Sequence, residues 1–287
     1  MKFKDITSSK SLFNQIVNLL EQIYNPNESR QLTKMLMTET LSISFEEIII
    51  DNEVDMVAIK GDVLEQQIEL LMSYHPIQYV LGKAHFFGRE FMVNPSVLIP
   101  RQETEELVKE ILIDNKKPNL KILDIGSGSG CIGITLALEL ADAQVTSLEI
   151  DKHALEVTMK NAEQHGVELE SISVDILAIN EFPSRYDIIV SNPPYVTEKE
   201  KKEMRNNVLN HEPHLALFVP DDDALKFYRK IIWLAKRNLN PNGKLYLEIN
   251  ESYGQEILTL CEDEKCSFLK LVQDINGKDR IVKAMFE

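Results

Sequence analysis

An asparagine, two prolines and a tyrosine stand together as Asn192-Pro193-Pro194-Tyr195, directly after the strand-like stretch 187–191. Proline fixes the backbone angle φ, and a residue that precedes a proline is held out of the helical region. The side-chain oxygen of Asn192 and the backbone carbonyl of Pro193 are therefore hydrogen-bond acceptors at fixed positions. Two acceptors that converge on one point suit an amino group attached to a planar system, and the ring of Tyr195 offers a flat face for that plane.

An amino group of this kind is a weak nucleophile, because its lone pair is delocalised into a carbonyl or a ring. Acceptors for both of its N–H bonds favour pyramidalisation and support the positive charge that develops as the nitrogen attacks. No strong base is needed before the attack. We therefore expect Asn192, Pro193 and Tyr195 to be catalytic residues, which position an amino nitrogen in line with a sulfonium methyl group.

A glycine-rich turn at 123–130 reads Leu-Asp-Ile-Gly-Ser-Gly-Ser-Gly and follows a short apolar strand. Glycines let the backbone approach a ligand closely, and the N–H groups of the next helix point at that ligand. Glu149 stands nineteen residues after Gly130, where its carboxylate can accept hydrogen bonds from both hydroxyls of a ribose. The glycine turn and Glu149 together predict an adenosine site. Residues 128–133 also fit the dinucleotide pattern G-x-G-x-x-G, so an NAD-type ligand stays open at this point.

Strands alternate with helices in the part of the chain that carries both motifs. We predict strands at 121–125, 144–149, 169–174, 187–190 and 244–249, and helices at 131–140, 153–165, 224–239 and 255–261, with 240–243 ending the long helix. This alternation implies an open, mostly parallel sheet covered on both faces, whose ligands lie beyond the carboxyl ends of the strands. The two motifs therefore share one crevice. Closing strands at 268–273 and 280–286 predict an antiparallel hairpin on the sheet.

The first quarter of the chain has helical periodicity and no strand-like alternation. Its apolar residues predict helices around 12–23, 32–36 and 54–71. We predict three parts: residues 1–74 as a helical bundle for docking a substrate, 75–100 as a β-hairpin connector and 101–287 as the α/β domain. The connector is assigned because aromatic and β-branched residues alternate there with Gly82 and Gly88.

The composition limits the classes of partner. The chain has 287 residues, with 31 basic and 46 acidic side chains and a formal charge of −15, which disfavours binding to bare nucleic acid. Three cysteines without a C-x-x-C pair predict neither a disulfide scaffold nor a structural zinc site, and no metal is expected. No stretch approaches the ~18 apolar residues of a membrane span, and the first residues lack a signal-peptide core. We expect a soluble, cytoplasmic protein without membrane contact.

Motifs from Pro76 onward resemble those of the peptide chain release factor glutamine methyltransferases, an S-adenosylmethionine-dependent family of the Asn-Pro-Pro-Tyr type. Adenine methyltransferases of nucleic acid share the glycine turn and the Asn-Pro-Pro-Tyr turn. The connector separates the two groups, because it reads Pro-Ile-Gln-Tyr-Val-Leu-Gly at 76–82 and Val-Leu-Ile-Pro-Arg-Gln-Glu-Thr-Glu at 97–105. Further matches to the first family are Phe86-Phe87-Gly88, Glu212-Pro213, Leu247-Glu248-Ile249 and Asp279-Arg280.

The resemblance implies a Rossmann-like, seven-stranded methyltransferase domain that methylates the glutamine of the Gly-Gly-Gln motif in translation release factors. It implies S-adenosyl-L-methionine as the cofactor, S-adenosyl-L-homocysteine as the product, and a protein substrate. We expect a monomer, because nothing in the sequence demands more than one copy. The residues that it assigns to the cofactor are Gly126, Ser127, Gly128, Ser129, Gly130, Glu149, Asp175, Ile176 and Asn192. Those that it assigns to the target glutamine are Asn192, Pro193, Pro194 and Tyr195. Two positions depart from the family pattern, which usually has Asp at 149 and a bulky or aromatic residue at 176.

Three alternatives remain open from the sequence. An adenine methyltransferase acting on DNA or RNA shares the chemistry of the turn, but the acidic charge and the connector motifs disfavour it. A non-catalytic adenosine-binding scaffold would leave Asn192 and Tyr195 without a role. A nucleotide-dependent oxidoreductase has no use for the Asn-Pro-Pro-Tyr turn.

Overall fold

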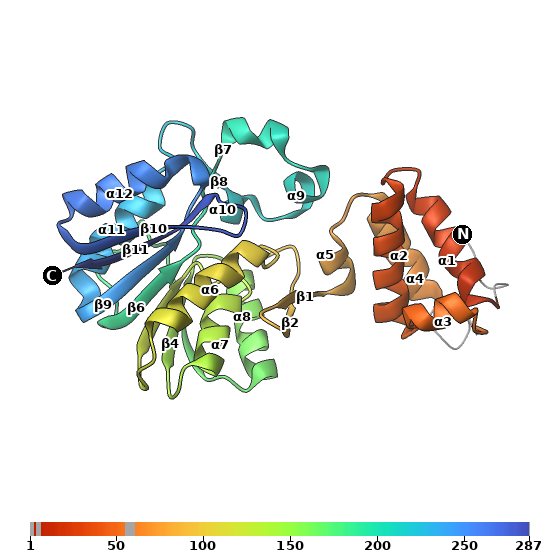
Figure 1. Cartoon of the computed structure of the whole chain (residues 1–287), viewed down its shortest axis with the longest axis horizontal. Helices are drawn as coiled ribbons and strands as arrows, with labels where there is room; N and C mark the ends of the chain where they lie inside the picture. The colour runs from red at the N-terminus through yellow and green to blue at the C-terminus, as the bar shows by residue number, and fades with distance from the viewer. Residues whose placement is uncertain (1–2, 4–6, 55–60, 287) are drawn as a thin grey trace. The chain divides into compact units, whose positions relative to one another are not determined.

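The computed structural model describes residues 3, 7–54 and 61–286. The chain divides into two compact units, of which one comprises Met1–Gly82 with Asn206–His211 and the other Lys83–Arg205 with Glu212–Glu287. Within the described part of the chain, none of the helices combines the length and the apolar character of a membrane span. Figure 1 labels the elements of both units along the chain.

The N-terminal unit is helical. Its helices are α1 (Ser9–Leu20), α2 (Pro26–Leu41), α3 (Phe45–Ile50), α4 (Gly61–Met72), α5 (Ile77–Leu81) and α9 (Asn206–His211). The first three begin at side chains that accept a hydrogen bond from the backbone of the first turn, namely Ser8, Asn25 and Ser44. Leucine and isoleucine side chains from α1, α2 and α4 pack together in its core.

Three points in the sequence-based prediction of this unit need correction. The single helix predicted over 54–71 begins at Gly61, Val54 lies outside it, and residues 55–60 fall outside the described residues. The separate helix α3 was not predicted, although Ser44 and Glu47 form a capping box there. The predicted connector also starts with a helix, because α5 precedes the hairpin and ends at Gly82, where φ is +73°. The predicted boundary at residue 74 thus falls between α4 and α5.

The second unit contains a seven-stranded sheet in the order β10-β11-β9-β6-β3-β4-β5 (Figure 1). Its strands are β3 (Lys121–Ile125), β4 (Gln144–Glu149), β5 (Leu169–Ser173), β6 (Tyr186–Ser191), β9 (Leu239–Glu248), β10 (Cys266–Gln273) and β11 (Asp279–Phe286). The five strands from β5 to β9 pair in parallel, whereas β11 is antiparallel to both β9 and β10. The predicted antiparallel closing hairpin is confirmed.

Helices cover both faces of this sheet. The residues of α6 (Gln102–Asp114), α7 (Cys131–Glu139) and α8 (Lys152–His165) form one apolar core with strand residues such as Ile122 and Val190. Those of α11 (Lys226–Asn238) and α12 (Gly254–Asp263) form a second core with Leu123 and Ile189. Adjacent residues of a strand point to opposite faces, so each strand contributes to both cores.

Short elements complete this unit. They are the hairpin β1 (Lys83–Phe86) and β2 (Arg89–Met92), the parallel pair β7 (Val196–Thr197) and β8 (Phe218–Val219), the single-turn helix α10 (His214–Leu217), and the 3-10 helices η1 (Glu198–Glu203) and η2 (Glu251–Tyr253). The largest difference from a predicted strand is in β9, which starts at Leu239 and includes 240–243. These residues lie within a register shift of the β6–β9 ladder, so the turn-like sequence interrupts the ladder without ending the strand.

The glycine that begins α7 offers a test of packing. A Cβ at Gly130 would lie 2.8 Å from Ile134 Cδ1 and 3.0 Å from Thr158 Cγ2, whereas a Cβ at Gly166 would meet nothing within 4 Å. Both glycines have positive φ, so an alanine at either position costs about 1–2 kcal/mol of backbone strain. We expect Gly130→Ala to lower the free energy of unfolding by about 1–3 kcal/mol more than Gly166→Ala, as overpacking does. Urea unfolding measures the difference, and equal losses would contradict this account.

Candidate active site

The turn after β3 bends back through three glycines with positive φ, namely Gly126 (+74°), Gly128 (+54°) and Gly130 (+79°). The contacts of Gly130 show that the packing of α7 against α8 requires it. At Gly126 and Gly128, by contrast, no atom of the described residues beyond the two chain neighbours lies within 4 Å of where a Cβ would stand. Both of these glycines line a cavity of about 260 Å³. They therefore border open space, as the predicted close approach of a ligand requires.

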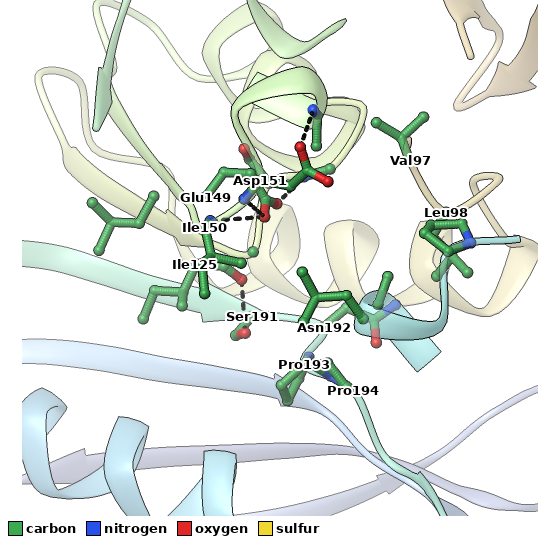
Figure 2. A pocket seen from close by; sticks show the side chains of 18 of the residues that line it. Val97, Leu98, Ile125, Glu149, Ile150, Asp151, Ser191, Asn192, Pro193 and Pro194 are labelled. Atoms are coloured by element: carbon green, nitrogen blue, oxygen red, sulfur yellow. Dashed lines mark hydrogen bonds between the residues drawn. The ribbon is translucent and has the colours of Figure 1, made fainter. Parts of the chain in front are cut away.

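Glu149 lies at the carboxyl end of β4, beside the glycine turn (Figure 2). Its Oε2 accepts a hydrogen bond from the backbone N–H of Gly128 at 3.0 Å. Its Oε1 accepts from the N–H groups of Ile150 and Asp151 at 2.8 and 3.1 Å. The glutamate thus folds back onto the amides that follow it, and this accommodates the extra methylene relative to aspartate. The carboxylate is held as an acceptor at the edge of the cavity.

Asp175 and Ile176 follow β5 and line the same cavity. Asp175 Oδ1 accepts a hydrogen bond from the N–H of Leu177 at 2.8 Å, and the N–H of Val174 donates to the backbone oxygen of Glu149 at 2.9 Å. Ile176 is partly buried against the core on the α11 side of the sheet. The loop after β5 is thereby tied to the end of β4. Ser127 and Ser129 of the glycine turn also line the cavity.

The turn after β6 reaches this cavity from the neighbouring strand. Ser191 ends β6, and its Oγ donates to the backbone oxygen of Ile125 at the end of β3, at 2.8 Å. Asn192, Pro193 and Pro194 line the cavity, and Figure 2 shows them across it from Glu149. The structure therefore brings together the residues predicted from the two motifs, with the exceptions of Gly130 and Tyr195.

Tyr195 lies outside the lining of the cavity, among the described residues. Its hydroxyl donates to Glu248 Oε1 at 3.3 Å, and its ring is partly buried against the apolar core that contains α11. Burial and the charge of Glu248 raise the pKa of Tyr195 well above its usual value near 10, so the phenol remains protonated and can donate. The expectation was a ring that faces the bound amino group, whereas the structure turns the hydroxyl of this residue toward a carboxylate.

The amide of Asn192 is oriented by a chain of hydrogen bonds. Its Nδ2 donates to Thr104 Oγ1 at 3.2 Å, and Thr104 Oγ1 donates to Glu248 Oε2 at 2.7 Å. Thr104 is 3% exposed and Glu248 is 1% exposed. Burial raises the pKa of Glu248 to about 7, while hydrogen bonds from Thr104 and Tyr195 and the charge of Arg280 oppose this rise. The Oδ1 end of Asn192 is the end turned away from Thr104.

A buried glutamate fixes the wall of the cavity formed by 96–101. Glu212 Oε2 accepts from the N–H of Ile99 at 3.2 Å, and Glu212 Oε1 pairs with Arg101 Nη2 at 2.6 Å. Sequence reasoning assigned no role to Glu212, Thr104 or Glu248, although all three belong to motifs matched above. A carboxylate within the otherwise apolar end of β9 is the signal that could have singled out Glu248.

Asp124 lies beneath the glycine turn and is fully buried. Its Oδ2 accepts from the N–H of Gly133 at 3.0 Å, and its Oδ1 has no hydrogen-bond partner among the residues that the structure describes. Burial, together with the charge of Glu149, raises the pKa of Asp124 to about 7. The carboxyl group therefore changes its charge near neutral pH.

Comparison with known proteins places the chain in a family. Residues 103–215 match the family model of the methyltransferase small domain. A release factor glutamine methyltransferase of Bacteroides thetaiotaomicron is 44% identical over 266 residues, which cover 92% of this chain and 95% of that protein. A protein of the same name from Flavobacterium psychrophilum is 42% identical over 281 residues, covering 96% and 99%. The chain belongs to the release factor glutamine methyltransferase family.

Two solved structures show that the fold of this family member is a common one. A methyltransferase from Pyrococcus furiosus is 17% identical, with a TM-score of 0.52 over 77% of this chain and 97% of that one. The hMettl16 catalytic domain, in complex with the MAT2A 3'UTR hairpin 6, is 15% identical, with a TM-score of 0.55 over 78% and 81%. The predictions of the release factor glutamine methyltransferase family, of its seven-stranded fold and of its enzyme class are confirmed.

The open space beside Gly128 yields a binding prediction for this family member. Gly128→Val would place a branched side chain in the cavity, so we expect S-adenosylmethionine to bind at least about tenfold more weakly, which corresponds to about 1.4 kcal/mol. Isothermal titration calorimetry measures the dissociation constant. Gly166→Val, which introduces the same side chain at another positive φ but outside the cavity, should keep the wild-type affinity. Unchanged affinity in a folded Gly128→Val variant would remove the glycine turn from the cofactor site.

The buried Asp124 yields a prediction for stability against pH. Its pKa is about 7 in the folded chain and near 3.8 when unfolded, so the unfolded chain ionises first as pH rises. This group therefore lowers stability by up to about 1.4 kcal/mol per pH unit between roughly pH 4 and 7. Asp124→Asn should reduce this loss of stability with rising pH, and the similar contribution of Glu248 should remain. Urea unfolding at pH 5, 6 and 7 tests this, and identical slopes in both proteins would contradict it.

Proposed function

We propose that this chain transfers the methyl group of S-adenosylmethionine to the side-chain amide nitrogen of a glutamine in a translation release factor, with Asn192 as the residue that receives the nucleophile. The observation that carries the proposal is the orientation of the Asn192 amide, whose Nδ2 is bound to Thr104 beside a cavity that Gly128 and Glu149 also line. The family of the chain supports the same reaction.

The residues that line the cavity suit the chemistry of the cofactor. Open space at two glycines would admit a ligand close to the backbone, and a fixed carboxylate would accept the hydroxyls of a ribose. The residues that we propose to hold the cofactor are Gly126, Ser127, Gly128, Ser129, Glu149, Asp175, Ile176 and Asn192, with Gly130 acting through the packing of the turn. When bound, S-adenosylmethionine supplies an electrophilic methyl group on a sulfonium.

The residues after β6 would handle the nucleophile. Asn192 Oδ1 and the carbonyl of Pro193 accept the two N–H bonds of the glutamine amide, and this support strengthens as positive charge develops on the nitrogen. Pro194 lines the cavity and fixes the backbone of the turn. Tyr195 acts from outside the lining of the cavity, through its hydrogen bond to Glu248.

The substrate that we propose is the glutamine of the Gly-Gly-Gln motif in release factors, which this chain would methylate in the cytoplasm as a monomer. The net charge of −15 supports a protein partner over bare nucleic acid. The helical unit comprising Met1–Gly82 and Asn206–His211 is the part that we propose for docking the release factor. Mass spectrometry of release factor incubated with enzyme and cofactor should find one added methyl group on the Gly-Gly-Gln peptide.

Removal of the Asn192 amide separates chemistry from cofactor binding. We expect Asn192→Ala to lower kcat by about 10²–10³, as loss of one preorganised polar partner does. The dissociation constant of the cofactor should change much less, because the glycine turn and Glu149 remain. Asn192→Asp keeps one acceptor oxygen and should retain partial activity. Steady-state methylation of release factor, quantified by mass spectrometry, measures each kcat.

A matched asparagine controls for indirect effects. Asn180 lies on the same unit outside the cavity, and its Oδ1 accepts only a long bond of 3.5 Å from Lys230 among the described contacts. Asn180→Ala should keep wild-type kcat and the wild-type melting temperature. Turnover of Asn192→Ala close to that of Asn180→Ala would overturn the acceptor role of Asn192.

A further inference from the structure

The side-chain amide of Asn192 has two ends of nearly equal size and opposite hydrogen-bonding character. Its terminal torsion is roughly two-fold, so rotation by half a turn exchanges an acceptor for a donor at the same place. The proposed chemistry works with only one of these orientations, because a donor aimed at the glutamine N–H bonds would repel them. Some neighbouring group must therefore set the orientation.

We propose that Glu248, acting through Thr104, fixes the Oδ1 end of Asn192 toward the substrate, which makes Glu248 and Thr104 positioning residues for the methyl transfer. This inference rests on the proposed function and deepens it. The carboxylate lies two hydrogen bonds away from Asn192, through the Thr104 hydroxyl.

The direction of each hydrogen bond in this chain follows from which groups carry a proton to donate. An ionised carboxylate only accepts hydrogen bonds, and a hydroxyl has a single proton to donate. Glu248 Oε2 takes the proton of Thr104 at 2.7 Å, so Thr104 Oγ1 can only accept from its other neighbour. That neighbour must present a donor, and Asn192 presents Nδ2 at 3.2 Å. The reverse orientation would set the Asn192 oxygen against the oxygen of Thr104.

Glu248 is hydrogen-bonded at its carboxylate and, separately, at its backbone. The Tyr195 hydroxyl donates to Oε1, and the Tyr228 hydroxyl donates to the backbone oxygen of Glu248 at 3.2 Å. Glu248 ends β9, which pairs with β6 and β11 in the middle of the sheet. Thr104 lies in the first turn of α6, which packs against the same sheet. The chain of hydrogen bonds therefore connects rigid elements to the catalytic turn.

Neutralisation of the carboxylate would reverse the chain of hydrogen bonds. A protonated Glu248, or a glutamine in its place, gains a donor, which satisfies the network best by pointing at Thr104 while its oxygen accepts from Tyr195. Thr104 would then donate to Asn192 Oδ1, and Nδ2 would face the substrate. The activity should accordingly fall as pH drops through the pKa of Glu248, which lies at about 7. The charged and titratable groups that face this carboxylate are Glu103 of α6, Cys131 of α7, Tyr195, Tyr228 of α11 and Arg280 of β11.

The experiment compares kcat, KM and pH dependence in five enzymes, namely the wild type and four variants, using release factor as the substrate and counting added methyl groups by mass spectrometry. At pH 8, Glu248→Gln and Thr104→Val should each lower kcat by about tenfold or more, with the KM for S-adenosylmethionine within about twofold of wild type. Thr104→Ser restores the hydroxyl and should keep kcat within about threefold. The wild-type kcat should fall on the acid side of pH 7, and Glu248→Gln should lack this fall.

Tyr228→Phe is the matched control, because it removes a hydrogen bond to the backbone of Glu248 and leaves the carboxylate network intact. It should keep the acid fall and a kcat within about twofold of wild type. The inference is overturned if Glu248→Gln keeps the wild-type kcat or its acid fall, or if Tyr228→Phe reproduces the whole loss. A wild-type enzyme that adds no methyl group to glutamine would instead overturn the proposed function, and the inference with it.

Discussion

The parallel pairing of β3 with β6 positions everything else in the site. Their ladder aligns Ile125 with Ser191, and the Ser191 hydroxyl donates to the backbone of Ile125 at 2.8 Å. The glycine turn and the Asn-Pro-Pro turn consequently leave the sheet at the same edge and line one cavity. A slip by one residue would send the side chains of a strand to the opposite face and separate these turns. The apolar cores on both faces hold this register.

Three buried carboxyl groups support the cavity from behind. Asp124 accepts from the backbone of α7, Glu212 holds the wall at Ile99 and Arg101, and Glu248 holds Thr104 and Tyr195. Burial of a charge costs stability unless hydrogen bonds or a counter-charge compensate for it. The raised pKa values of Asp124 and Glu248, both about 7, show that compensation is incomplete. The burial of these carboxyl groups costs stability, while their hydrogen bonds fix the orientation of the residues that they contact.

Much of the fold follows from local sequence. The strands at 121–125 and 144–149 have the predicted bounds, since each is a short stretch with β-branched residues, bordered by polar or glycine-rich turns. The N-terminal unit departs further from its prediction, because α3 is an additional helix and Val54 lies outside α4. The short α9 is grouped there through tertiary contacts, such as the ring of His211 packed 3.9 Å from that of His75. Such contacts join segments far apart in the chain, which no local pattern encodes.

The sequence by itself determined the family, the reaction and the two turns of the site, because these motifs are local and each stands at the end of a strand. Only the tertiary structure decided how the Asn192 amide is oriented and what Tyr195 contacts. Thr104 and Glu248 are 144 residues apart in the chain, and they meet because α6 packs on the sheet where β9 ends. A hydrogen bond between side chains of different elements depends on strand register and helix packing, and neither is set by local propensity.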